Sequence, residues 1–226
     1  MRKFLQNIGI AGVLPLIMAL VPFSGKAQYA QIVDQLPQLL SPALSGSMKY
    51  KGFVDATATF GVGNNKANFV GLSTTQGFQY SSWFFMGAGI GIDVAMLNLD
   101  ANIPDQPLAP GMSKTKAMIP LFSDFRFNIG GTGKPSFFID IKAGAAWLLG
   151  GSYLQLNTGA LSTRTQFILR PSLGVRIPTN SQKPKQAINI GVTYQLITAN
   201  NSWGYWGGSG YDTTLSSIGA TVGYEW

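Results

Sequence analysis

Strict alternation of apolar with small or polar residues dominates the chain, and the last ten residues show it most clearly. In an extended strand over residues 217–226, Ile218, Ala220, Val222, Tyr224 and Trp226 share one face, and small or polar side chains occupy the other. Two aromatic residues at the end of the apolar face suit a wall that contacts lipid and carries an aromatic girdle. The pattern indicates a strand of a transmembrane β-barrel rather than of a soluble sandwich.

Seven further segments alternate in the same way, and they have about the length, roughly 9–11 residues, that a tilted strand needs to cross a bilayer. They are residues 50–62, 69–80, 83–96, 117–129, 137–149, 165–177 and 188–196. With the C-terminal strand they make eight, and closed single-chain bacterial barrels have an even number of strands. We therefore expect an all-β protein, an eight-stranded antiparallel transmembrane β-barrel with up-and-down meander topology, over residues 49–226.

The connections and the placement of charge support a membrane barrel. At one end of the predicted barrel the connections are long: residues 98–116, 150–164 and 198–214. The one short connection at this end is residues 63–66, and all connections at the other end are short. With both termini in the periplasm, the long set lies outside the cell, as such barrels prefer. The alternative is a soluble lipocalin-like barrel, with apolar residues inside. Here the charges share a face with Gly, Ser and Thr, and the aromatic face would be a large exposed apolar patch on a soluble protein.

The N-terminus has the features of a cleaved secretory signal peptide over residues 1–27. Arg2 and Lys3 precede a mostly apolar run, and small residues lead to a cleavage site after Ala27. The alternative is a transmembrane helix anchor, but Gly12 and Pro15 interrupt the run. Residues 28–48 would then form a periplasmic leader, which either folds under the barrel, is disordered or docks a partner.

Composition narrows the chemistry. The chain has no cysteine, which excludes disulfides and thiolate metal sites, and no histidine, which excludes the usual general base and imidazole metal ligands. Charged residues make up only 11%, and the formal charge of +7 includes Arg2, Lys3 and Lys26 of the predicted signal. Because no basic cluster stands out, nucleic acid is not an expected partner. We expect no enzymatic activity, no cofactor and no metal.

The inward faces of the predicted strands carry nearly equal numbers of basic and acidic residues, which predicts a paired network in the lumen. These residues are Lys51, Asp55, Asp93, Asp124, Arg126, Asp140, Lys142, Arg164, Arg170, Arg176 and Glu225. We expect Arg126 to pair with Asp124 or Asp140, and Lys51 with Glu225, where the first and last strands close. An eight-stranded barrel is just wide enough for its own side chains, so we expect no aqueous channel.

An aromatic, glycine-rich connection is the candidate binding segment outside the lumen. Residues 200–211 contain Trp203, Tyr205, Trp206 and Tyr211, and aromatic faces with neighbouring amides suit sugar rings or a protein partner. The alternative is that these rings belong to the outer girdle or fold over the mouth of the barrel.

A resemblance to a known family rests on five segments: residues 50–55 (YKGFVD), 119–126 (IPLFSDFR), 138–144 (FIDIKAG), 170–176 (RPSLGVR) and 223–226 (GYEW). Together they resemble small outer-membrane β-barrel proteins of Bacteroidota, similar to the OmpA transmembrane domain. The ending with Tyr224 and Trp226 resembles the C-terminal signature by which such barrels are recognised for assembly. The resemblance implies the bacterial outer membrane, with its lipid and the barrel assembly machinery as partners. The peptidoglycan-binding domain of full OmpA proteins is not expected here.

Three functional hypotheses follow. The first is a non-enzymatic barrel with a filled lumen that is structural or binds a glycan or protein through its outer loops. The second is an accessory subunit of a larger outer-membrane complex, for which Ala56 and Ala58 hint at a patch of small lipid-facing residues. The third is a narrow transporter of small apolar molecules, which needs an apolar lumen and is disfavoured by the inward charges.

Overall fold

The structure is a computed structural model, and it describes residues 48–63, 65–97, 111–130, 134–156, 159–161, 165–179, 186–200 and 212–226. The predicted signal peptide, and the predicted leader apart from Met48, lie outside the described residues. The described part of the chain contains no helix with the length and hydropathy needed to span a membrane.

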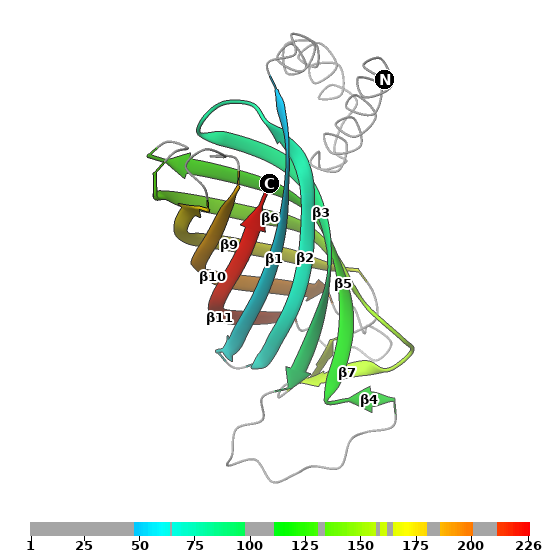
Figure 1. Cartoon of the computed structure of the whole chain (residues 1–226). Helices are drawn as coiled ribbons and strands as arrows, with labels where there is room; N and C mark the ends of the chain where they lie inside the picture. Colours follow the sequence, from blue (N-terminus) through cyan, green and yellow to red (C-terminus); the bar gives the residue numbers. More distant parts are fainter. Residues whose placement is uncertain are drawn as a thin grey trace, which may run out of the picture.

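Eight long strands close into one antiparallel barrel, which confirms the predicted fold class (Figure 1). They are β1 (Lys49–Val62), β2 (Ala67–Gln79), β3 (Phe84–Leu97), β5 (Thr115–Ile129), β6 (Ser136–Leu148), β9 (Gln166–Pro178), β10 (Ala187–Asn200) and β11 (Asp212–Glu225). Each strand pairs with the next long strand along the chain, and β11 returns to pair with β1. The barrel is therefore a meander with no free edge.

The seam between β1 and β11 runs from Phe53↔Glu225 to Val62↔Ser216. Two further backbone hydrogen bonds, Gly52 N to Trp226 O at 3.2 Å and Trp226 N to Gly52 O at 3.1 Å, extend the pairing to the last residue. Gly52 is required here because a Cβ at this position would lie 2.5 Å from Cζ2 of the Trp226 ring. The C-terminal ring thus packs directly on the backbone of the first strand.

Burial alternates along every barrel strand because successive side chains point to opposite faces. The outward residues are apolar and exposed, for example Phe60 at 68%, Phe137 at 62% and Val192 at 61%. The inward residues include nearly all of the buried charges. Period-two alternation in the sequence therefore predicted which face of each strand is exposed.

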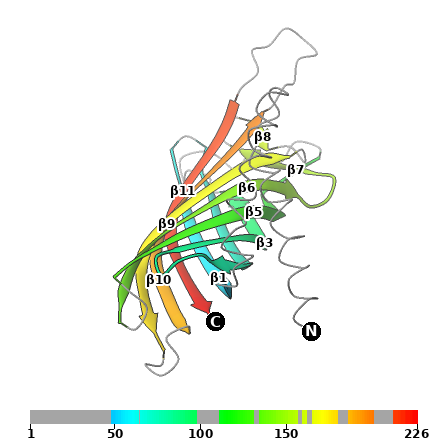
Figure 2. The ribbon, with the colours of Figure 1, turned by 90° about the horizontal axis from the view of Figure 1, so that it is seen from above.

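The two ends of the barrel differ, and Figures 1 and 2 show this from two directions. At the end called here the C-terminal end, β1 begins and β11 stops at Glu225, next to Trp226. At the opposite end, called here the hairpin end, β4 (Met112–Ser113), β7 (Tyr153–Leu156) and β8 (Gly159–Leu161) form a small separate sheet in the order β4-β7-β8. Residues 98–116 and 150–164, predicted as long connections, thus include short strands outside the barrel, which show no readable alternation in the sequence.

Candidate functional site

The lumen is the candidate site, and it contains two zones that differ in polarity. Along β5, the inward residues change from Met118 near the hairpin end to Asp124 and Arg126 nearer the C-terminal end. The same change occurs on β9, from Ile168 to Arg170 and Arg176. The buried charges thus lie in the middle and at the C-terminal end, together with buried rings such as Phe53 and Phe138, and apolar side chains fill the hairpin end.

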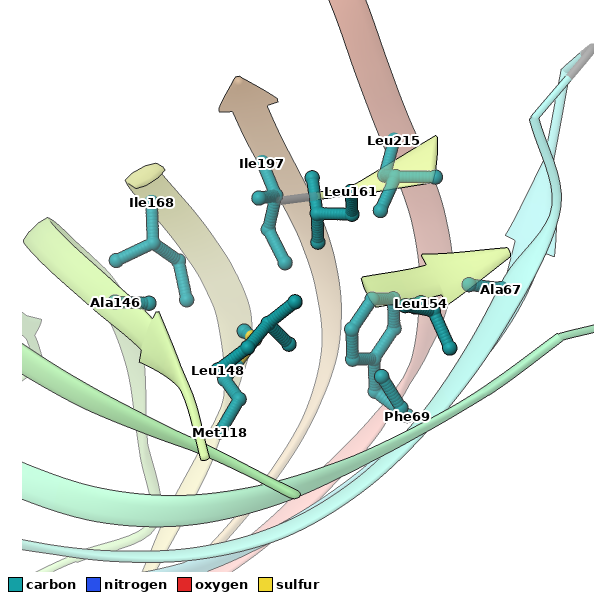
Figure 3. Packing of buried hydrophobic residues seen from close by; sticks show 11 residues of the cluster. Ala67, Phe69, Met118, Ala146, Leu148, Leu154, Leu161, Ile168, Ile197 and Leu215 are labelled. Atoms are coloured by element: carbon teal, nitrogen blue, oxygen red, sulfur yellow. The ribbon is translucent and has the colours of Figure 1, made fainter. Parts of the chain in front are cut away.

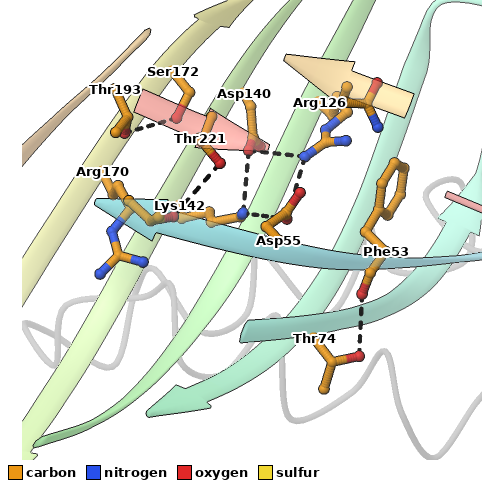
Figure 4. Close-up of polar contacts among 12 residues, drawn as sticks. Phe53, Asp55, Thr74, Arg126, Asp140, Lys142, Arg170, Ser172, Thr193 and Thr221 are labelled. Atoms are coloured by element: carbon orange, nitrogen blue, oxygen red, sulfur yellow. Dashed lines mark hydrogen bonds and ion pairs between the residues drawn. The ribbon is translucent and has the colours of Figure 1, made fainter. Parts of the chain in front are cut away.

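The middle of the lumen holds an ion-pair cluster, named here the central network: Asp55 of β1, Arg126 of β5, and Asp140 and Lys142 of β6 (Figure 4). Lys142 Nζ lies 2.6 Å from Asp55 Oδ2 and 3.4 Å from Asp140 Oδ2. Arg126 Nη2 donates to Asp140 Oδ2 at 3.0 Å and lies 3.6 Å from Asp55 Oδ2. All four side chains are at most 5% exposed, so the two cations and two anions neutralise one another in the dry interior.

Asp124 lies next to this network but makes no ion pair with it. The structure places Arg126 with Asp140, one of the two expected partners, and no ion pair joins Asp124 to a cation among the described residues. Asp124 is nevertheless fully buried, at 0% exposure. Its carboxylate is the least satisfied acidic group of the described lumen, since neither of its oxygens has a hydrogen-bond partner among the described residues.

A second ion pair lies between the central network and the hairpin end. Arg170 Nη2 of β9 lies 2.5 Å from Asp93 Oδ2 of β3, and Arg170 Nε donates to Gln195 Oε1 at 2.8 Å. β3 and β9 are not neighbouring strands, so this pair crosses the barrel. Gly71 makes the approach possible, because a Cβ there would overlap Oδ1 of Asp93.

A third cluster closes the lumen at the C-terminal end. Glu225 Oε1 of β11 lies 3.0 Å from Lys51 Nζ and 2.5 Å from Arg176 Nη2, and Asn189 Nδ2 donates to Glu225 Oε2 at 3.3 Å. The pair of Lys51 with Glu225 expected from the closing seam is thus present in the structure. An aromatic side chain, Phe53, lies between this cluster and the central network, with its ring centroid 4.0 Å from Arg126 Cζ.

The hairpin end of the lumen is apolar, which the sequence analysis did not predict (Figure 3). Its buried residues, named here the apolar chamber, are Ala67, Phe69, Ala95, Met118, Ala146, Leu148, Leu154, Leu161, Ile168, Ile197 and Leu215. Nine of them come from the barrel wall, whereas Leu154 of β7 and Leu161 of β8 enter from the small sheet and are 0% exposed. Figure 3 shows Leu154 beside Phe69, and Leu161 beside Ile197 and Leu215.

One buried cation at the edge of the apolar chamber was also missed. Lys116 is 8% exposed, and it points inward one position before Met118 on the same face of β5. Its Nζ donates to Ser152 Oγ, 2.9 Å away, in the segment that leads into β7. The predicted strand began at residue 117, which left Lys116 in a loop; extending the alternation of Met118 back by two residues would have found it.

The remaining predicted site residues lie on the outer wall or outside the described residues. Tyr224 and Trp226, the predicted assembly signal, are 41% and 38% exposed, and their rings stack with centroids 6.3 Å apart. Arg164 and the loop aromatics Trp203, Tyr205, Trp206 and Tyr211 lie outside the described residues. In the part that is described, no three acidic side chains come together in a way that could hold a metal ion.

What the lumen can do follows from its packing. A water-filled channel would leave its lining side chains accessible to water, but Arg126, Arg176 and Glu225 are at most 1% exposed. Side chains that pair across the barrel therefore occupy this part of the lumen, as expected for a barrel of this size.

Comparison with known proteins gives matches among solved structures only. No known protein family matches the chain, and no curated protein matches it. Among solved structures, Neisserial surface protein A (NspA) matches 79% of this chain and 97% of its own at 11% identity and a TM-score of 0.47. The outer membrane enzyme PagL matches 76% of this chain and 97% of its own, at 15% identity and a TM-score of 0.45. The N-terminal β-barrel domain of Pseudomonas aeruginosa OprF matches 78% of this chain and 97% of its own, at 10% identity and a TM-score of 0.36.

Proposed function

We propose that the protein is a non-enzymatic β-barrel of the bacterial outer membrane. Its lumen does not conduct ions, and it is either structural or binds a glycan or protein through its outer loops. The observation that supports this most directly is that the barrel wall is apolar on the outside and charged on the inside. Large apolar side chains such as Phe60 and Val192 are exposed, whereas Arg126 and Asp140 are buried. Lipid is the solvent that suits such a surface, because in water it would expose a large continuous apolar patch.

The ion pairs support a structural role for the charged part of the lumen. A selective pore concentrates one sign of charge along an open path. Here the cations and anions of the central network contact one another at 2.6–3.6 Å, and the clusters around Arg170 and Glu225 are paired in the same way. These contacts join strands across the barrel, which supports a structural role for the paired charges.

Two measurements test the proposal. Membranes of cells that express the full chain are extracted with alkaline carbonate, and the purified protein is then reconstituted in a planar bilayer. We expect the protein to stay in the membrane pellet, to migrate differently on gels before and after boiling, and to give no steady conductance. Release by carbonate would contradict the membrane location, and stable unitary currents would contradict the closed lumen.

A small-residue patch at the seam favours a second candidate, an accessory subunit of a larger complex. The register pairs Ala58 of β1 with Ala220 of β11, next to Ala56, and all three are exposed on the outer wall. Small residues let another membrane protein approach the backbone closely. Gentle detergent extraction followed by affinity purification and mass spectrometry tests this candidate: a stoichiometric partner that is lost in Ala58→Phe would support it, and a lone barrel would contradict it.

A further inference from the structure

The apolar chamber and Lys116 together have the composition of a binding site for a small amphiphile. We propose that the hairpin end of the lumen binds a medium-chain fatty acid, with the carboxylate on Lys116 and the acyl chain in the apolar chamber. This goes beyond the proposed function, since it assigns a ligand to the lumen while the charged zone below stays closed.

The first argument is the state of Lys116. Its ammonium group has three donors, and Ser152 Oγ accepts one of them at 2.9 Å. Five other inward cations of the described lumen, those of Lys51, Arg126, Lys142, Arg170 and Arg176, each contact a carboxylate. Lys116 contacts none among the described residues, although it is only 8% exposed. A buried cation without an anion is costly, so this position is suited to an anion supplied by a ligand.

The second argument is the way the chamber is filled. Leu154 and Leu161 are fully buried in it, but they belong to a sheet that pairs only within itself in the described part of the chain. The leucines are therefore held by apolar contact rather than by the hydrogen-bond ladder of the barrel. An acyl chain can take the volume that the two leucine side chains occupy, because a core accepts apolar groups of similar volume, and its own burial offsets the cost of displacing them. Ser152 links Lys116 to the segment just before β7, so binding at the ammonium group and movement of β7 are coupled.

The third argument limits the length of the ligand. The wall residues of the chamber occupy two inward positions on β2 and β6 and one on each of the other five strands that contribute, a depth of roughly 7 Å along the strand direction. Below them the ion pair of Arg170 with Asp93 crosses the lumen and forms a polar floor. The ligand should therefore be a short acyl chain, for which octanoate is the probe, because the polar floor ends the apolar part of the lumen.

The experiment measures binding of isotope-labelled octanoate to the full-length protein in lipid nanodiscs by equilibrium dialysis, with empty nanodiscs as the background. We expect one saturable site per barrel. In Lys116→Gln the affinity should fall about 10- to 100-fold, the loss of one charge-assisted contact. Lys49→Gln, which removes an exposed lysine at the C-terminal end, is the matched control and should bind as the unaltered protein does. Octanol has the same chain without the charge, so its affinity should be the same for Lys116→Gln and for the unaltered protein.

A second readout follows the hairpin itself. The chain has no cysteine, so Leu161→Cys introduces a single thiol into the chamber. We expect octanoate to speed its labelling by a maleimide, because the ligand displaces this side chain, and acetate to leave the rate unchanged. Heat-modifiable gel mobility shows that each variant has folded. The proposal is overturned if octanoate binding does not exceed that of empty nanodiscs, or if Lys116→Gln binds octanoate as tightly as the unaltered protein.

Discussion

Replacing Arg170 by methionine should destabilise the barrel strongly, because the change leaves Asp93 buried without a counter-charge. The two side chains are 4% and 1% exposed, and Arg170 Nη2 lies 2.5 Å from Asp93 Oδ2. Removal of one partner from a buried ion pair costs about 3–5 kcal/mol, and most of this cost is the isolated charge. The free energy of unfolding, measured by urea titration in detergent micelles with tryptophan fluorescence, should fall by that amount.

The double variant Asp93→Asn with Arg170→Met separates the cost of the isolated charge from the value of the pair. It removes both charges, so its stability should exceed that of Arg170→Met alone by about 1–3 kcal/mol. Lys49→Met is the control for loss of a lysine charge at an exposed position and should stay within about 0.5 kcal/mol. If Arg170→Met lost less than about 1 kcal/mol, the pair would behave like a solvated surface pair and the dry lumen would be refuted.

Three further predictions concern other parts of the molecule. Gly52→Ala should slow closure of the barrel, seen as a smaller heat-modifiable fraction after refolding, because its Cβ would lie 2.5 Å from the C-terminal indole ring; Gly151→Ala, where nothing lies within 4 Å, should refold normally. Leu161→Ala should lower the free energy of unfolding in urea by about 2–5 kcal/mol if the leucine is part of the core, and an unchanged value would show that the hairpin does not fill the lumen. Trp203→Ala with Trp206→Ala should leave heat-modifiable mobility intact and weaken binding to surface glycan or protein; unchanged binding would assign these rings to the girdle.

The sequence predicted local features well because alternation is a local signal. Each barrel strand was found within a few residues of its ends, apart from the terminal strand, which begins at Asp212 rather than at residue 217. The pair of Lys51 with Glu225 was accessible because β1 and β11 are neighbours in any closed meander. The inward face alone thus identifies which charges meet when their strands are adjacent.

Contacts across the barrel were not accessible from the sequence. The pair of Asp93 with Arg170 joins β3 and β9, and whether two such residues meet depends on the tilt and shear of the closed sheet, which no single strand reveals. The apolar chamber was missed for a related reason. Its wall residues look like single exceptions in otherwise polar inward faces, and only closure of the barrel brings Phe69, Ile197 and Leu215 together around the hairpin leucines.

Stability measurements on a Lys116 variant distinguish a charge that stabilises the barrel from a charge that binds a ligand. Arg170 is paired, so its loss isolates an anion; Lys116 contacts only a hydroxyl among the described residues, so Lys116→Met removes a buried cation and isolates nothing. Ser152 is half-buried and can bond to water instead. Without ligand, the free energy of unfolding of Lys116→Met should therefore be unchanged or about 1–2 kcal/mol higher, as is common when a functional polar group is replaced in a core. A loss as large as that of Arg170→Met would make Lys116 a structural cation and would remove the reason for assigning an anionic ligand to the chamber.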